Sequence, residues 1–276
     1  MNSATLTENP ELDAVLADGL QRWWRNAIFL GMAAVLVMAA MLYAGVLDPN
    51  RYRDALPTIF TLARDSLPPD FSRWRSWGRP LLETLSMSIA GTLLAVLAAL
   101  PLGILAARNV GSRHLAPSVR LLLNGLRSIP CLVWGVIFVA AVGFGPLPGV
   151  LALAAHSTGM LGKFCAEILE HVDSAPGNAL RSQGVGTIGV LRFAVWPQIL
   201  PRLIDVTLYR CEHNLRAATT LGVVRAGGLG LEIVTAFHLF EYQEASALIL
   251  VLLVLVSLIN IFGAKVRAAF LGSTSY

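Results

Sequence analysis

The stretch SIPCLVWGVIFVAAVGFGPLPGVLALAAHSTGMLG, residues 128–162, decides the fold class. It contains no Asp, Glu, Lys or Arg, and its middle, residues 143–149, carries three glycines and two prolines. A helix does not continue through such a segment, so it predicts a tight hairpin between two apolar helices. Paired apolar helices without charges are typical of proteins that cross a lipid bilayer.

The composition of the whole chain supports a membrane protein. Its 276 residues are 55% hydrophobic and only 14% charged, whereas an ordinary soluble domain is about 25% charged. So few charges do not cover a water-facing globule of this size, and disordered chains are richer in charge. We therefore predict an all-α polytopic membrane protein.

Other apolar segments predict the remaining spans, since roughly 20 apolar residues cross a bilayer. Residues 26–47, 84–107 and 245–264 are uncharged or nearly so. Residues 199–222 predict a further span, although this segment is polar. With the two helices beside the hairpin, the total is about six transmembrane helices.

The polar residues of segment 199–222 gather on one side of a helix. Those within a sector of about 100° are Arg202, Asp205, Tyr209, Glu212, His213, Arg216 and Thr220. Charges inside a membrane face a protein interior or a wet cavity, which predicts a helix lining a polar path. A cytoplasmic amphipathic helix is the alternative. Glu212 and Arg216 are four residues apart, the right spacing for an ion pair.

Two other features extend the candidate path. His156 lies in the middle of an apolar segment, where it either has a polar partner or lines the path. Residues 226–230 hold three glycines after Arg225, and we expect an external re-entrant loop there, with an anion nest or a plain helix cap as alternatives. The candidate path residues are His156, Arg210, Glu212, His213, Arg216, Arg225, Gly227 and Gly228. Lys163 and Glu167 are spaced as a surface ion pair.

Basic residues predict the orientation by the positive-inside rule. Most of them lie in the segments on one side of the predicted membrane, and the N-terminus is on that side. We therefore place the N-terminus in the cytoplasm. Residues 48–79 are the exception, because this external segment holds six Arg and four Asp. Its Trp74 and Trp77 predict an interfacial element with an aromatic anchor.

Residues 172–198 form the longest polar stretch of the apolar half. Pro176 and Gly177 predict a turn, Asn178 predicts the N-cap of a short helix, and Gly184 predicts the end of that helix. A short helix between two spans on the basic side is suited to docking a partner. An ordinary loop is the alternative.

This loop resembles the EAA loop of binding-protein-dependent ABC importer permeases, which reads Glu-Ala-Ala, three residues, Gly, nine residues, Ile-x-Leu-Pro. Ala179, Gly184 and Pro197 stand at the matching positions, while Asn178 replaces the Glu. Further stretches resemble phosphonate and phosphite importer permeases, namely residues 82–85, 101–109, 127–134, 159–167, 208–210 and 216–230. The resemblance covers roughly residues 80–265.

The resemblance implies a type-I importer of phosphonate, phosphite or a related phosphorus oxyanion in the bacterial inner membrane. Two permease copies would form the path, two ATP-binding subunits would hold ATP and magnesium, and an external binding protein would deliver the ligand. The residues that would dock on the ATPase are Asn178, Ala179, Arg181, Gln183, Gly184 and Pro197. The implied division is an N-terminal segment 1–79, a permease core 80–265 and a cytoplasmic tail 266–276.

The sequence lacks the motifs that would indicate ATP binding or an enzyme. The chain has no GxxxxGK[ST] motif, so we expect ATP to be bound by a partner and no cofactor by this chain. No catalytic triad, pair of catalytic carboxylates or metal-ligand spacing occurs, which disfavours an enzyme, and nothing indicates nucleic-acid binding. An ion-coupled secondary transporter of a small anion remains the alternative, although we find no internal repeat of the kind such carriers have.

Overall fold

The computed structural model describes residues 10–110 and 114–271, and these residues form helices joined by turns. The chain divides into two compact units, Met1–Arg64 and Asp65–Tyr276. Part of the expected tail, residues 272–276, lies outside the described residues. The rest of that tail continues the last helix of the second unit.

The first unit contains a long helix, α1 (Pro10–Tyr43), followed by η1 (Pro49–Arg51) and most of α2 (Ala55–Asp65). The apolar part of α1, Gly19–Tyr43, is long enough to cross a membrane, and none of it is buried within the chain. The helix starts and ends earlier than the expected span 26–47. It ends early because Gly45 adopts a left-handed conformation (φ 71°) that turns the chain.

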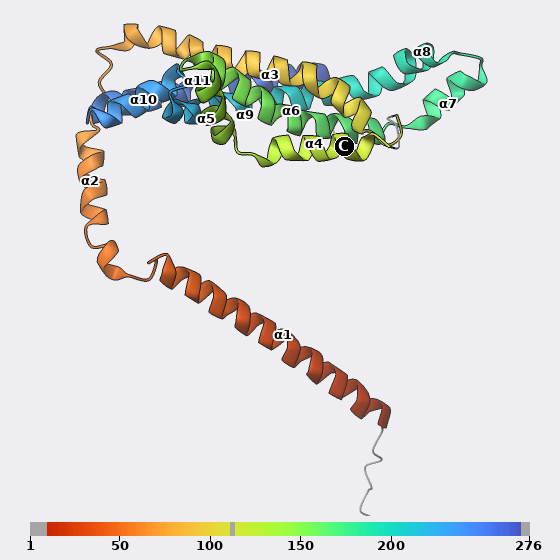
Figure 1. The fold of residues 1–276 in the computed structure, drawn as a ribbon, viewed down its shortest axis with the longest axis horizontal. Helices are drawn as coiled ribbons and strands as arrows, with labels where there is room; N and C mark the ends of the chain where they lie inside the picture. Colours follow the sequence, from red (N-terminus) through yellow and green to blue (C-terminus); the bar gives the residue numbers. More distant parts are fainter. Residues whose placement is uncertain (1–9, 111–113, 272–276) are drawn as a thin grey trace, which may run out of the picture. The chain divides into compact units, whose positions relative to one another are not determined.

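The second unit is a bundle in which α3, α6 and α9 lie side by side (Figure 1). Its elements are η2 (Trp74–Trp77), α3 (Gly78–Ala106), α4 (Ala116–Ser128), α5 (Cys131–Val142), α6 (Pro146–Glu170), α7 (Ser174–Ser182), α8 (Thr187–Val190), η3 (Leu191–Val195), α9 (Trp196–Thr220), η4 (Leu221–Val224), α10 (Gly228–His238) and α11 (Tyr242–Leu271). The short helices α7 and α8 lie at one end of the bundle, and α10 lies at the other.

Helix α6 forms the centre of the bundle, because it packs against α3, α4, α5 and α9. Glycines make these approaches close. A Cβ on Gly159 would lie 2.6 Å from the backbone nitrogen of Arg127 and 2.7 Å from the carbonyl oxygen of Leu123, both in α4. A Cβ on Gly103 of α3 would lie 2.6 Å from the Cβ of Cys165. Small residues of this kind let helix backbones meet in membranes.

Within the described residues, three helices are long and apolar enough to span a membrane, or up to five if each bent pair counts as one span. The three are Gly19–Tyr43, Gly78–Ala106 and Tyr242–Ala268, and the bent pairs are α4 with α5 and the α9 region with α10. The expected total of about six also counted α6. Helix α6 is less apolar than the helices that qualify as spans by composition. It tolerates more polar residues because neighbouring helices bury much of its surface.

The expected third span is not a straight helix. Helices α4 and α5 meet at an angle of 88°, and the chain between them passes through Ile129 and Pro130. Pro130 causes the break, since a proline disfavours the helical conformation in the residue before it. The hairpin after α5 is confirmed, because Gly143 (φ 89°) and Gly145 (φ 124°) separate α5 from α6.

The α4–α6 contact generates a stability prediction. Gly159→Ala is expected to lower the thermal midpoint of the detergent-solubilised chain, because the new Cβ would overlap backbone atoms of α4. Overpacking of this kind costs about 1–3 kcal/mol. In the control, Gly125→Ala of α4, the added Cβ meets nothing within 4 Å, so the midpoint is expected to hold or rise. Equal midpoints for the two variants would contradict the close approach.

Candidate functional site: a polar helix and a loop helix

The polar residues of α9 do not share one environment. Tyr209 and Arg216 are exposed on the single chain, His213 is half-buried, and Arg210 and Glu212 are buried. The predicted single polar sector is therefore divided. One part stays on the surface of the chain, and the rest faces neighbouring helices.

A chain of hydrogen bonds ties α9 to α6 and α3. The Arg210 Nε donates to Ser157 Oγ at 2.9 Å, and Ser157 Oγ donates to Asn214 Oδ1 at 2.9 Å. Asn214 Nδ2 donates to Thr92 Oγ1 at 2.9 Å, and Thr92 donates to the Ser88 carbonyl at 2.7 Å. Asn214 is fully buried, so its partners replace the water that it gives up on folding. The sequence analysis missed Ser157, Asn214 and Thr92, which a pairwise spacing rule does not detect.

Glu212 has a different partner from the one expected. Its Oε1 accepts from Arg267 Nη1 of α11 at 2.6 Å, so the predicted pair with Arg216 is wrong. The reason is that Gly263 lets the carboxylate press against α11, where any Cβ would collide with Glu212 Oε1. Arg216 instead stays exposed.

His156 lies beside the break between α4 and α5. Its Nδ1 is 3.1 Å from the carbonyl oxygen of Ile129, and because a carbonyl only accepts, Nδ1 carries the hydrogen. Arg210 lies close to His156, because its Nε donates to Ser157, the residue that follows His156 in α6. The candidate residues His156 of α6 and Arg210 of α9 thus lie near each other, beside the break between α4 and α5.

The glycine-rich run lies elsewhere, next to the hairpin. Gly227 (φ 85°) and Gly228 (φ 74°) precede and begin α10. The N–H of Gly228 donates to Glu83 Oε2 at 3.0 Å, so a carboxylate of α3 occupies the place where an anion nest was considered. Arg225 adopts a left-handed conformation at the end of η4, where its N–H donates to the Gly222 carbonyl at 3.0 Å, and its guanidinium lies over the ring of Phe144 at 5.7 Å.

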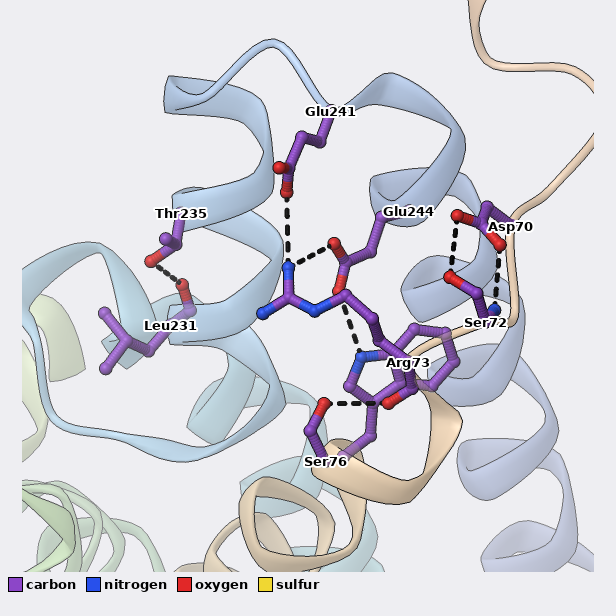
Figure 2. Close-up of polar contacts among 9 residues, drawn as sticks. Asp70, Ser72, Arg73, Ser76, Leu231, Thr235, Glu241 and Glu244 are labelled. Carbon is purple, nitrogen blue, oxygen red and sulfur yellow. Dashed lines mark hydrogen bonds and ion pairs between the residues drawn. The ribbon is translucent and has the colours of Figure 1, made fainter.

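A second polar cluster anchors the segment before α3 (Figure 2). Arg73 Nη1 donates to Glu244 Oε2 at 2.8 Å and lies 3.5 Å from Glu241 Oε2. Trp77, which is buried, donates from Nε1 to Glu244 Oε1 at 3.2 Å. Trp77 is thus held by a carboxylate of α11, whereas Trp74 is exposed.

The loop helix α7 begins earlier than expected. Asp173 is its N-cap and accepts the N–H of Ala175 at 2.9 Å, so the prediction of Asn178 as N-cap and of a turn at Pro176 is wrong. A proline is tolerated in the first turn of a helix because its missing N–H has no partner there. Gly184 (φ 82°) closes the helix, and its N–H donates to the Arg181 carbonyl at 3.0 Å.

The surface of α7 is free within the chain, and its base is packed. Asn178, Ala179, Arg181 and Gln183 are exposed, as are Gly184 and Pro197. Gly177 is buried, and a Cβ there would lie 3.4 Å from Val190 and 3.9 Å from Ala194.

A side chain of α9 joins the two ends of the loop. The Oε1 of Gln198 accepts the Asp173 N–H at 3.0 Å, and its Nε2 donates to the Ala194 carbonyl at 2.8 Å. Gln198 is a further residue that the sequence analysis missed. At the same end, Lys163 and Glu167 form the predicted ion pair at 3.5 Å. No group of metal-ligating side chains occurs in the described part of the chain.

Residues 99–270 match the family model of the binding-protein-dependent transport system inner membrane component. The chain belongs to this family. It is 50% identical over 252 residues to the phosphite transport system permease protein PtxC of Stutzerimonas stutzeri, covering 90% of both chains. It is also 38% identical over 224 residues to the phosphate-import permease protein PhnE of Mycolicibacterium smegmatis, covering 81% of this chain and 42% of that longer protein.

Solved structures of ABC transporters have a fold similar to that of this chain. The MetNI methionine ABC transporter in an inward-facing conformation matches with a TM-score of 0.62 at 22% identity, covering 70% of this chain and 95% of that one. The chain is thus an ABC importer permease with the type-I fold, and it is a transport subunit rather than an enzyme.

The Glu212–Arg267 pair of this permease can be tested by a double-mutant cycle. Glu212→Gln and Arg267→Gln are each expected to lower the thermal midpoint, because each leaves a largely buried charge without its partner. The double variant is expected to recover part of the loss, since neither charge then remains. Losses that simply add would show that the two residues do not stabilise each other.

Proposed function

We propose that this permease carries phosphite, or a closely related phosphorus oxyanion, into the cell in an ATP-driven importer. The observation that carries the proposal is the 50% identity to a phosphite transport permease over 90% of both chains. The buried guanidinium of Arg210 on α9 suits an anionic substrate, which needs positive charge along its path.

The exposed polar residues of α9 support pairing with a second permease subunit. Arg216 and Tyr209 are exposed on the single chain, yet they belong to a helix with apolar residues on its other sides. A charge facing lipid is costly, so such a face is covered by protein or by a water-filled path. We propose a homodimer in which the α9 helices of two copies face this path.

The loop helix α7 would be the contact with the ATPase. It presents exposed polar residues at the end of the bundle opposite α10. In this proposal two ATPase subunits hold ATP and magnesium, and the external binding protein delivers the anion at the α10 end. The N-terminus would lie in the cytoplasm, as the positive-inside rule predicts.

The contacts of α7 provide a route from ATP to the path. Gly177 packs on Val190 and Ala194, and Gln198 of α9 holds the start of α7 through Asp173. A displacement of α7 is therefore passed to α9, which also bonds to α3 and α6. The result is alternating access, in which the helices rock together about the path.

The docking role of α7 leads to a co-purification prediction. Gly184→Arg is expected to abolish stoichiometric recovery of the ATPase encoded beside this chain, because it strains the left-handed cap and adds a bulky charge to an exposed surface. Gly184→Asn is the matched control, since asparagine tolerates this conformation, and it is expected to keep the ATPase. The yield and size-exclusion profile of the permease show whether each variant is folded.

Two results would contradict this model. Recovery of the ATPase with folded Gly184→Arg would remove α7 from the docking surface. Recovery of the wild-type permease without any ATPase, together with uptake driven by an ion gradient, would favour a secondary transporter.

The homodimer is tested with two differently tagged copies of this chain expressed together with the ATPase. Purification through one tag is expected to recover the other tag, because the polar face of α9 requires a partner of the same kind. Recovery of a different permease chain in place of the second copy would show a heterodimer instead.

A further inference from the structure

Arg210 is a buried cation without a counter-charge. The residue is 2% exposed, and its Nη2 is the only buried side-chain nitrogen or oxygen in the described residues that has no hydrogen-bond partner. The structure shows no ion pair between Arg210 and any described carboxylate. Glu212, two residues along α9, is already bound to Arg267.

The position of Arg210 makes this feature costly. It lies near the middle of α9, a 25-residue helix, and a buried charge in the membrane is retained only where something compensates it. The Nε of Arg210 is held by Ser157, and Ser157 is held by Asn214. The guanidinium is thus fixed in place by neutral groups, which orient its charge and leave that charge unbalanced.

Arg210 is linked to the break between α4 and α5 through two consecutive residues of α6. The Arg210 Nε donates to Ser157, and His156, the residue before Ser157, has its Nδ1 3.1 Å from the Ile129 carbonyl oxygen at that break. Non-helical backbone at membrane depth persists only where it is covered by protein or lines a cavity. His213, three residues after Arg210 on α9, is half-buried.

We propose that Arg210 is the residue that holds the oxyanion in an occluded state midway along the path. Its Nη2 would donate a charge-assisted hydrogen bond to an oxygen of the anion, whose negative charge balances the guanidinium. This inference rests on the proposed function and names the site at which the substrate is contacted. The anion reaches Arg210 when α5 moves away from α6 and α9, a movement that leaves the packing of α3, α4 and α6 intact.

The test uses the complex of permease, ATPase and binding protein in proteoliposomes, with radiolabelled phosphite as the probe. Arg210→Gln is expected to reduce uptake about tenfold to a hundredfold, the effect of losing one hydrogen bond to an ion. Basal ATP hydrolysis and assembly are expected to persist. Uptake by Arg210→Lys is expected to lie between that of the wild type and that of Arg210→Gln, because lysine keeps the charge and lacks the planar guanidinium. Lys265→Gln, which removes an exposed charge from α11, is the control and is expected to transport normally.

A second measurement separates binding from a structural role. The thermal midpoint of the permease–ATPase complex is recorded with phosphite and with chloride at equal ionic strength. Phosphite is expected to raise the wild-type midpoint by a few degrees and to leave that of Arg210→Met unchanged. Without phosphite, Arg210→Met is expected to be at least as stable as the wild type, because an uncompensated buried charge has been removed.

The other outcomes either overturn the proposal or separate a wrong substrate from a wrong site. Normal uptake by Arg210→Gln overturns it, and so does a lower midpoint for Arg210→Met with loss of the complex, which would show that another subunit supplies the counter-charge. If the wild-type complex hydrolyses ATP and takes up no phosphite, the proposed substrate is wrong. In that case the anion site stands only if phosphite still stabilises the wild type and not Arg210→Met.

Discussion

Ser157, Asn214 and Thr92 join three helices through one run of hydrogen bonds, and the arrangement of the bundle depends on it. Lipid offers no partner to a polar group, so each buried polar side chain must be satisfied by protein or by what the protein binds. A helix as polar as α9 is stable here because α3 and α6 supply those partners. The same hydrogen bonds also fix which side of α9 faces α3 and α6.

The close packing of α6 and the contacts of α9 join several helices of the bundle into one stiff unit. Glycines at 103 and 159 bring backbones together, so that α3, α4 and α6 have little freedom to slide. Glu212 attaches α9 to α11, and Gln198 attaches it to the start of α7. In a transporter, such a unit moves as one body and carries a displacement from the loop helix to the membrane interior.

The errors of the sequence analysis have one cause, which is that local spacing does not reveal a distant partner. Glu212 is correctly spaced for Arg216, yet Arg267 is nearer because Gly263 opens the surface of α11. Asn178 is a good N-cap by type, yet Asp173 reaches the first N–H groups of α7. Glu83 was named only within the family-like stretch 82–85 and was given no partner, because its partner is the N–H of Gly228, far along the chain.

The sequence by itself determined the helical membrane class, the hairpin at 143–149, the loop helix ended by Gly184 and the family, because these depend on hydropathy, on glycine and proline, and on local motifs. Only the tertiary structure decided which polar residues of α9 are buried, which one lacks a partner, and where α4 and α5 bend. The physical reason is that hydrogen bonds and ion pairs inside a membrane are satisfied between helices, and helix periodicity gives the face of a residue without giving what lies opposite.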